Sequence, residues 1–231
     1  MKCWHRLLGC CIVIVAFTAA GIYSGKMAMD VFRKDAVDFR QHTVVIDPGH
    51  GGEDGGASTL DGKKESAYNL EIAVRLNDVM QLLGYRTQMI RCEDTAVYTK
   101  GETLAQKKAD DLKQRVLIAN QSENNVLVSI HQNHFSQPQY RGAQVFYAKN
   151  EQSQLLAQAL QQILVTALNP ENNRKCKAGE GIYLLEKCKV CGVLVECGFL
   201  SNQAEASLLE KPDYQKKLAC VIGSCIASNL S

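Results

Sequence analysis

The feature that most constrains the fold of this chain is an alternation of two residue patterns after residue 42. Short apolar runs rich in β-branched residues, typical of buried strands, are each followed by a longer segment with helical apolar spacing. Strands that alternate with helices favour a largely parallel sheet with helices on its faces. We therefore expect an α/β fold, a single three-layer domain with a twisted, mostly parallel central sheet flanked by helices.

The expected elements can be placed by residue number. Apolar runs predict strands at 43–46, 87–90, 126–130, 143–147 and 193–195, and more weakly at 181–185. Apolar residues three and four positions apart predict helices at 67–83, 110–121, 153–168 and 213–230. With only four prolines and no internal repeat, residues 42–231 are expected to form one catalytic domain.

The first 29 residues predict a membrane anchor or a signal peptide. Lys2 and Arg6 precede the uncharged run 7–23, which would span about 26 Å as a helix, near the lower limit for crossing a bilayer. Cleavage as a signal peptide stays an alternative, as does a buried core helix. Basic residues on the short side predict a cytoplasmic N-terminus and an extracytoplasmic domain, membrane-anchored or secreted. Residues 30–41 are polar and are expected to be a linker.

The charge balance argues against a nucleic-acid partner. The chain has 26 basic and 24 acidic residues, and the basic excess lies within residues 1–41, so that 42–231 has a net charge of −1. Binding to nucleic acid needs a basic stripe that such a domain lacks. The partner is therefore expected to be recognised by a local site.

The cysteines do not form a complete disulfide framework. Three of the ten belong to the N-terminal segment, and the remaining seven cannot all pair within the domain. Cys188 and Cys191 have CxxC spacing, but no second pair follows to complete a structural zinc site. Ordinary semi-buried thiols are favoured here, with a loop disulfide or redox role as the alternative.

Unusual polar residues stand where the expected strands end. His50, His131 and Glu196 each follow a strand, and Glu65 begins a helix after a glycine-rich connection that could fold back to the same edge. In open α/β sheets, ligands bind at the carboxyl ends of the strands. Two histidines and one glutamate are the ligand set of a catalytic zinc site, which keeps a position for water. The other glutamate would act as a base.

Each of these residues also has an ordinary structural interpretation. A single histidine beside a strand is usually a packing or capping residue, and Glu65 alone would suit a helix N-terminus; their convergence favours the metal site. His134 as a fourth ligand is disfavoured, because four protein ligands would leave no room for water. Nucleophilic catalysis is disfavoured because there is no GxSxG motif and Cys197 has no oriented histidine.

The motifs that contain these residues resemble those of the zinc-dependent N-acetylmuramoyl-L-alanine amidases of the amidase-3 type. The matching segments are VVIDPGHGG (44–52), KES (64–66), Arg115 with Ala119-Asn120, VSIHQN (128–133) and VECGFLSN (195–202). The match runs in order from about residue 43 to the end. The segments GIYLL (181–185) and FLSNQAEASLLEKP (199–212) are most similar to the germination-specific, sporulation members. His134 and two cysteines, Cys191 and Cys197, depart from the family pattern.

The resemblance implies one catalytic Zn²⁺ held by His50, Glu65 and His131, with Glu196 as the catalytic carboxylate. It implies hydrolysis of the amide that joins N-acetylmuramic acid to L-alanine in peptidoglycan. Asn133 and Arg115 would orient the substrate or the metal ligands. Equally, Asn133 could cap a loop and Arg115 could form an ion pair on the surface of a helix.

The sporulation branch further implies a place in the forespore envelope and spore cortex. There, peptide removal and a peptidoglycan deacetylase together prepare muramic-δ-lactam, which is needed for germination. A zinc site with three protein ligands and a glycine-rich loop is also compatible with an accessory activator protein that completes or stabilises the site. The alternatives are another zinc peptidoglycan hydrolase, a carboxypeptidase or a deacetylase, and a non-catalytic wall-binding protein on the same fold. The complete set of four residues argues against the last.

Overall fold

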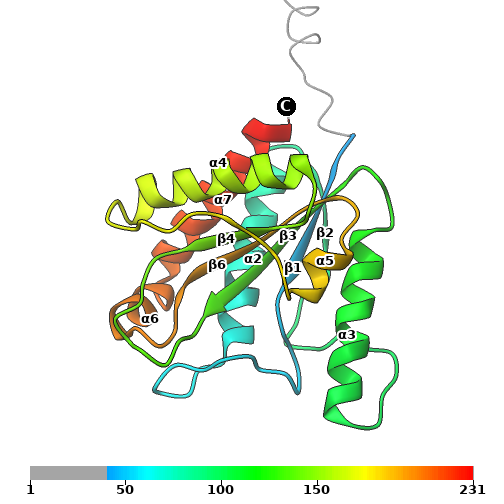
Figure 1. Ribbon diagram of the computed structural model, residues 1–231, viewed down its shortest axis with the longest axis horizontal. Coiled ribbons are helices and arrows are strands. Elements are labelled where there is room, and N and C mark those ends of the chain that lie inside the picture. The colour runs from blue at the N-terminus through cyan, green and yellow to red at the C-terminus, as the bar shows by residue number, and fades with distance from the viewer. Residues whose placement is uncertain (1–40, 231) are drawn as a thin grey trace, which may run out of the picture. The chain divides into compact units, whose positions relative to one another are not determined.

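The computed structural model describes residues 41–230, which form a helix-covered sheet (Figure 1). The expected membrane segment 1–29 and the linker, apart from residue 41, lie outside the described residues. No helix within 41–230 combines the length and the apolar character needed to cross a membrane.

The central sheet is mostly parallel, as expected. Its order is β2-β1-β3-β6-β4-β5, and the only antiparallel pair among the described strands is β4 with β6. The six strands are β1 (Thr43–Pro48), β2 (Arg86–Met89), β3 (Asn125–Asn133), β4 (Gln144–Tyr147), β5 (Lys177–Ala178) and β6 (Cys191–Phe199).

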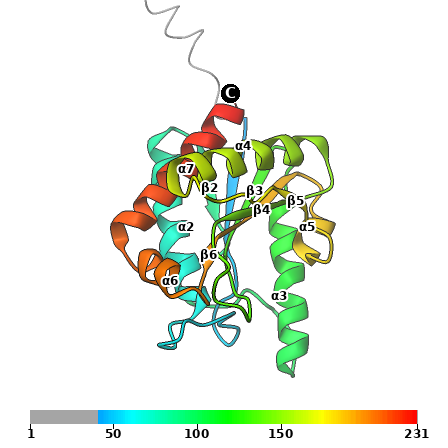
Figure 2. The ribbon, with the colours of Figure 1, turned by 60° about the vertical axis from the view of Figure 1, so that its left-hand side comes forward.

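Helices cover both faces of this sheet (Figure 2). Helices α2 and α4 pack on the sheet and on α7, with α6 beside them, whereas α3 and α5 pack on the other face. Their bounds are α2 (Glu65–Leu82), α3 (Leu104–Ala119), α4 (Glu151–Leu168), α5 (Tyr183–Lys187), α6 (Gln203–Leu209) and α7 (Pro212–Leu230). This arrangement confirms the three-layer α/β prediction.

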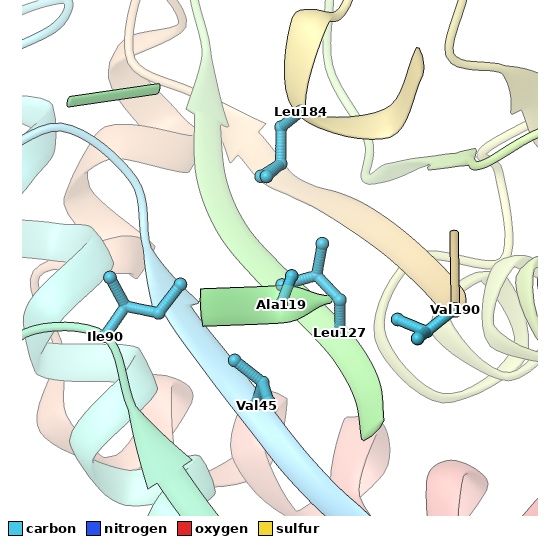
Figure 3. Packing of buried hydrophobic residues seen from close by; sticks show 6 residues of the cluster. All are labelled: Val45, Ile90, Ala119, Leu127, Leu184 and Val190. Carbon is cyan, nitrogen blue, oxygen red and sulfur yellow. The ribbon is translucent and has the colours of Figure 1, made fainter. Parts of the chain in front are cut away.

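The core on the α3 side joins the central strands to both helices of that face. Val45 on β1 and Leu127 on β3 are completely buried and belong to one cluster with Leu184 of α5 and with Ala119, the last residue of α3 (Figure 3). The buried members of this cluster are Val45, Ile90, Ala119, Leu127, Leu184 and Val190. Burial of such side chains contributes about 1.5–3 kcal/mol each, so this cluster fixes α3 against the strands that carry the polar residues.

Three expectations about elements were wrong in detail. The weak strand at 181–185 is instead the helix α5, since Glu186 closes a helical turn with Ile182 and its carboxylate accepts from the Gly181 amide. Helix α3 begins at Leu104 rather than 110, because Thr103 and Gln106 form a capping box. Helix α6, which was not expected, begins after Asn202, whose side chain caps it.

Strands β3 and β6 are longer than expected, which changes the position of two key residues. His131 and Glu196 lie within these strands rather than after them. They are register partners on the two neighbouring parallel strands. The residues therefore lie side by side in the carboxyl half of the sheet, close to the edge that was predicted.

Candidate active site

The turn that carries His50 is shaped for close approach to neighbouring groups. His50 has a φ of +60°, a conformation that a non-glycine residue adopts at a cost. A Cβ at Gly49 would lie 2.1 Å from Nε2 of His131, and one at Gly56 would lie 2.5 Å from Oε2 of Glu65. These two glycines thus let the loop close over the histidine and the glutamate.

Two buried arginines hold the carbonyl groups of this turn. Arg115 donates from Nη1 to the Pro48 carbonyl at 2.9 Å and from Nη2 to the His50 carbonyl at 2.7 Å. Arg91 donates to the carbonyls of Pro48 and Gly49 at 2.8 and 3.0 Å. These hydrogen bonds fix the strained turn from below, and sequence reasoning gave Arg91 no role.

Arg115 also forms a buried ion pair at the end of β1. Its Nη1 lies 2.5 Å from Oδ1 of Asp47, and its Nε lies 2.6 Å from Oδ2 of Asp111. Burial alone would raise the pKa of Asp47, but Arg115 and a hydrogen bond from the Ser129 hydroxyl hold it below its usual value. The interpretation of Arg115 as a helix-surface pair is therefore wrong, because its side chain is only 2% exposed.

His50, Glu65 and His131 converge on one point. Nε2 of His50 lies 3.3 Å from Oε2 of Glu65, and Nδ1 of His131 lies 3.0 Å from Oε1. Donor atoms around a tetrahedral zinc ion with bonds of ~2.1 Å stand about 3.4 Å apart. One donor atom from each of the three residues lies within 4.8 Å of the others, so the group could hold a metal ion.

The carboxylate of Glu65 is kept charged and oriented. The backbone amides of Ala57 and Gln132 donate to its two oxygens at 3.0 and 3.1 Å. Its burial would raise its pKa, but hydrogen bonds with His131 and His50 lower the pKa well below its usual range. A charged carboxylate between two imidazoles is a favourable ligand for a divalent cation.

Asp54 orients the ring of His50. Its Oδ2 lies 3.1 Å from Nδ1 of His50, which leaves Nε2 facing Glu65. Its other oxygen pairs with Nζ of Lys108 at 2.8 Å. Burial lowers the pKa of His50, but Glu65 and Asp54 outweigh it and raise that pKa to about 8. A carboxylate that contacts the second ring nitrogen of a histidine ligand commonly fixes the tautomer of that histidine. The position of Asp54, four residues after His50, was the signal in the sequence that we missed.

Glu196 is the reactive carboxylate without a protein partner. Its Oε2 is buried and accepts no hydrogen bond from the described residues. Burial raises its pKa to about 7, with His131 and Glu65 acting on it in opposite directions. A carboxyl group with this pKa can both accept and donate a proton near neutral pH.

The remaining residues considered as catalytic lie outside this group. His134 is exposed and does not belong to the metal-ligating set found among residues 41–230. Cys197 is buried, and its surroundings raise its pKa far above that of a reactive thiol. Asn133 is tied to β6 through its carbonyl, which accepts from the Leu200 amide. All seven cysteines of the described residues are free thiols.

Comparisons with known proteins agree with this geometry. Residues 44–228 match the family Amidase_3, N-acetylmuramoyl-L-alanine amidase. The chain is 42% identical over 183 residues to the germination-specific N-acetylmuramoyl-L-alanine amidase of Bacillus subtilis, which covers 78% of this chain and 76% of that protein. It is 30% identical to the N-acetylmuramoyl-L-alanine amidase LytC of the same species, over 78% of this chain but only 34% of LytC.

A solved structure shows the same architecture. The CwlD amidase from Clostridioides difficile, in complex with the GerS lipoprotein, superimposes with a TM-score of 0.78. The identity is 38%, and the superposition covers 82% of this chain and 98% of that one.

Proposed function

The chain belongs to the Amidase_3 family and is an N-acetylmuramoyl-L-alanine amidase, and from this premise we propose that it is a zinc enzyme acting on spore peptidoglycan. The domain 42–231 would hydrolyse the amide between the lactyl group of N-acetylmuramic acid and L-alanine. One observation carries the proposal. A two-histidine, one-glutamate donor set lies beside Glu196, which is half-buried and whose Oε2 is buried without a hydrogen-bond partner among the described residues.

His50, Glu65 and His131 would hold the ion with one donor atom each. The three donor atoms lie within 4.8 Å of one another, and the charge on Glu65 fits a divalent cation. Nitrogen with oxygen donors suits zinc. When bound, zinc lowers the pKa of water and polarises a carbonyl group. Asp54 keeps Nε2 of His50 directed at the site, while Arg91 and Arg115 hold the turn below it.

Glu196 would move the proton during hydrolysis. Its carboxylate accepts a proton from the attacking water and delivers it to the nitrogen of L-alanine as the C–N bond breaks. The products are a lactyl carboxylate on the glycan and a free amino group on the peptide. The pKa of about 7 suits both transfers.

The biological setting rests on the similarity to the germination-specific relative of Bacillus subtilis. The reaction would strip peptides from cortex glycan, and a peptidoglycan deacetylase would then allow the muramic-δ-lactam to form. Residues 1–29 would anchor the domain outside the cytoplasm, in the forespore envelope, or be removed as a signal peptide. Since a relative is in complex with a lipoprotein, an accessory lipoprotein is the expected protein partner of this chain as well.

The proposal is tested by identifying the group that the protein exposes on peptidoglycan. Zinc-loaded protein is incubated with spore or vegetative peptidoglycan, and new amino and carboxyl groups are identified by labelling and mass spectrometry. New L-alanine amino groups, absent with Glu196→Gln, are the expected result. A new D-residue carboxylate would indicate a carboxypeptidase, and a glucosamine amine would indicate a deacetylase. Binding of peptidoglycan without cleavage of any bond would contradict the proposed hydrolase activity.

A further inference from the structure

Two exposed aromatic side chains lie in contact after β3. The exposed fractions of Phe135 and Tyr140 are 48% and 40%, and their rings meet edge to face with centroids 4.9 Å apart. The large hydrophobic side chains that are exposed within residues 41–230 include one further aromatic residue, Tyr183. Exposed apolar side chains that contact one another, unlike singly exposed ones, are a feature of binding sites.

A buried layer supports the pair and fixes its orientation. The ring of Tyr140 stacks on Phe199 at 6.5 Å, and Phe199 is only 3% exposed. The guanidinium group of Arg174 lies 4.6 Å from the centre of the Phe199 ring. The exposed rings are therefore held on a packed base.

The loop that carries the pair is tied to β6 and α6. The Phe135 amide donates to the Ser201 hydroxyl at 3.1 Å, and the Asn202 side chain donates to the Pro138 carbonyl at 2.8 Å. Glu205 accepts from the amides of both Gly142 and Phe199. Such bonds reduce the conformational entropy that a ligand would otherwise have to remove on binding.

The pair follows the strands that carry two residues of the candidate active site. Phe135 is four residues after His131, and Phe199, beneath Tyr140, is three residues after Glu196. Three residues of strand correspond to roughly 10 Å. Since the substrate amide belongs to a sugar of a long glycan strand, sugars next to the cleaved amide extend over a distance of this size from Glu196.

We propose that Phe135 and Tyr140 form a platform on which a sugar ring of the peptidoglycan glycan strand packs while the neighbouring amide is cleaved. The inference rests on the proposed function and adds a binding subsite to it. The face of an aromatic ring is electron-rich, so the polarised C–H groups of a pyranose face pack favourably against it.

The charges around the platform favour the glycan over the stem peptide. Arg141 pairs with Glu171, and Arg174 is held against the rings of Tyr140 and Phe199 and donates to Oε1 of Gln144. An uncharged sugar face needs apolar area, which the two exposed rings supply. A stem peptide would instead be bound through its carboxylates, and its binding would depend on Arg174 rather than on the rings.

The test is the affinity of the zinc-loaded full chain for a peptide-free tetrasaccharide of alternating N-acetylglucosamine and N-acetylmuramic acid. Calorimetry compares the wild type with Phe135→Ala and Tyr140→Ala. We expect the dissociation constant to rise about tenfold in each variant, the scale of one lost aromatic contact. Tyr140→Phe, which keeps the ring, should bind like the wild type. Tyr183→Ala is the matched control at an exposed tyrosine elsewhere and should also leave affinity unchanged.

Hydrolysis separates failure of the platform from failure of the proposed function. Both alanine variants should cleave a single-sugar muramoyl peptide at the wild-type rate and lose efficiency only on longer glycans. Unchanged tetrasaccharide affinity in the variants, or no binding by the wild type, would overturn the platform even if the amidase activity is present. If the alanine variants bound an accessory lipoprotein more weakly but kept their affinity for the sugar, the pair would be a protein interface. That result would also overturn the platform. Tetrasaccharide binding that depends on the rings, without cleavage of any amide, would keep the platform and refute the proposed function.

Discussion

Replacing Arg115 with methionine tests whether a buried ion pair holds the turn that carries His50. Methionine has an unbranched chain that can fill much of the space but donates no hydrogen bonds. The variant would leave Asp47 buried with Ser129 as its remaining side-chain donor. The carbonyls of Pro48 and His50 would also lose a donor.

The size of the effect follows from the burial of both partners. The side chains of Arg115 and Asp47 are 2% and 1% exposed, so water cannot replace the lost partner. Removing one partner of a buried pair costs about 3–5 kcal/mol. The double variant Arg115→Met/Asp47→Asn removes the stranded charge and should regain part of this loss.

The measurement is urea unfolding of the metal-free full chain at pH 7, followed by circular dichroism. Arg141→Met is the matched control, because Arg141 and Glu171 are 58% and 75% exposed and such pairs contribute about 0–1 kcal/mol. A loss below about 1 kcal/mol in Arg115→Met, or one no larger than in the control, would refute the role given to the pair.

The ion pair of Arg115 and Asp47 also predicts how the difference in unfolding free energy between wild type and Arg115→Met depends on pH. The pKa of Asp47 is held below its usual value in the folded protein. Its contribution is therefore complete above the unfolded-state value of about 4 and is lost as the pH falls through the lower folded value. The gap between wild type and Arg115→Met should narrow in acid, and a gap that widened there would contradict the assignment.

Three further results are expected from the site. Glu196→Gln should reduce kcat by about 10²–10⁴-fold, the usual contribution of a general acid–base group, while zinc content measured by mass spectrometry stays at the wild-type value; loss of zinc would make Glu196 a ligand instead. Because the pKa of His50 is raised to about 8, zinc must displace its proton at pH 7. Zinc affinity should therefore fall as the pH drops below 8, with release of about one proton at pH 7 in calorimetry with different buffers; a pH-independent affinity would exclude His50 as a ligand. Gly49→Ala, whose methyl group would meet the ring of His131, should abolish zinc binding, whereas Gly62→Ala, where the added Cβ meets no neighbour, should keep it; equal zinc binding by both variants would contradict the packing described at Gly49.

Much of the fold followed from local patterns in the sequence. The β-branched runs predicted five strands at nearly the observed positions. The runs are most continuous in β1, β3 and β6, because parallel strands buried on both faces must be apolar on both. The direction of β4 could not be predicted, since its residues would suit either orientation beside β6. The segment 181–185 was assigned to a strand because short apolar runs do not distinguish strands from short helices.

The reactive residues could be identified from the sequence, but the residues that hold them in position could not. His50, His131 and Glu196 follow or end apolar runs, which placed them at one edge of a parallel sheet. By contrast, Arg91 lies 43 residues from Pro48, whose carbonyl it contacts. Such pairings depend on the completed tertiary structure, and nothing in the local pattern marks them.

The role of the metal is tested most directly by a zinc titration of metal-stripped protein, in which the release of L-alanine amino groups from peptidoglycan is measured. We expect no release without metal and a linear rise that saturates at one zinc ion per chain. Full release by the stripped protein, unchanged by added zinc, would contradict the assignment of His50, Glu65 and His131 as the ligands of a catalytic ion.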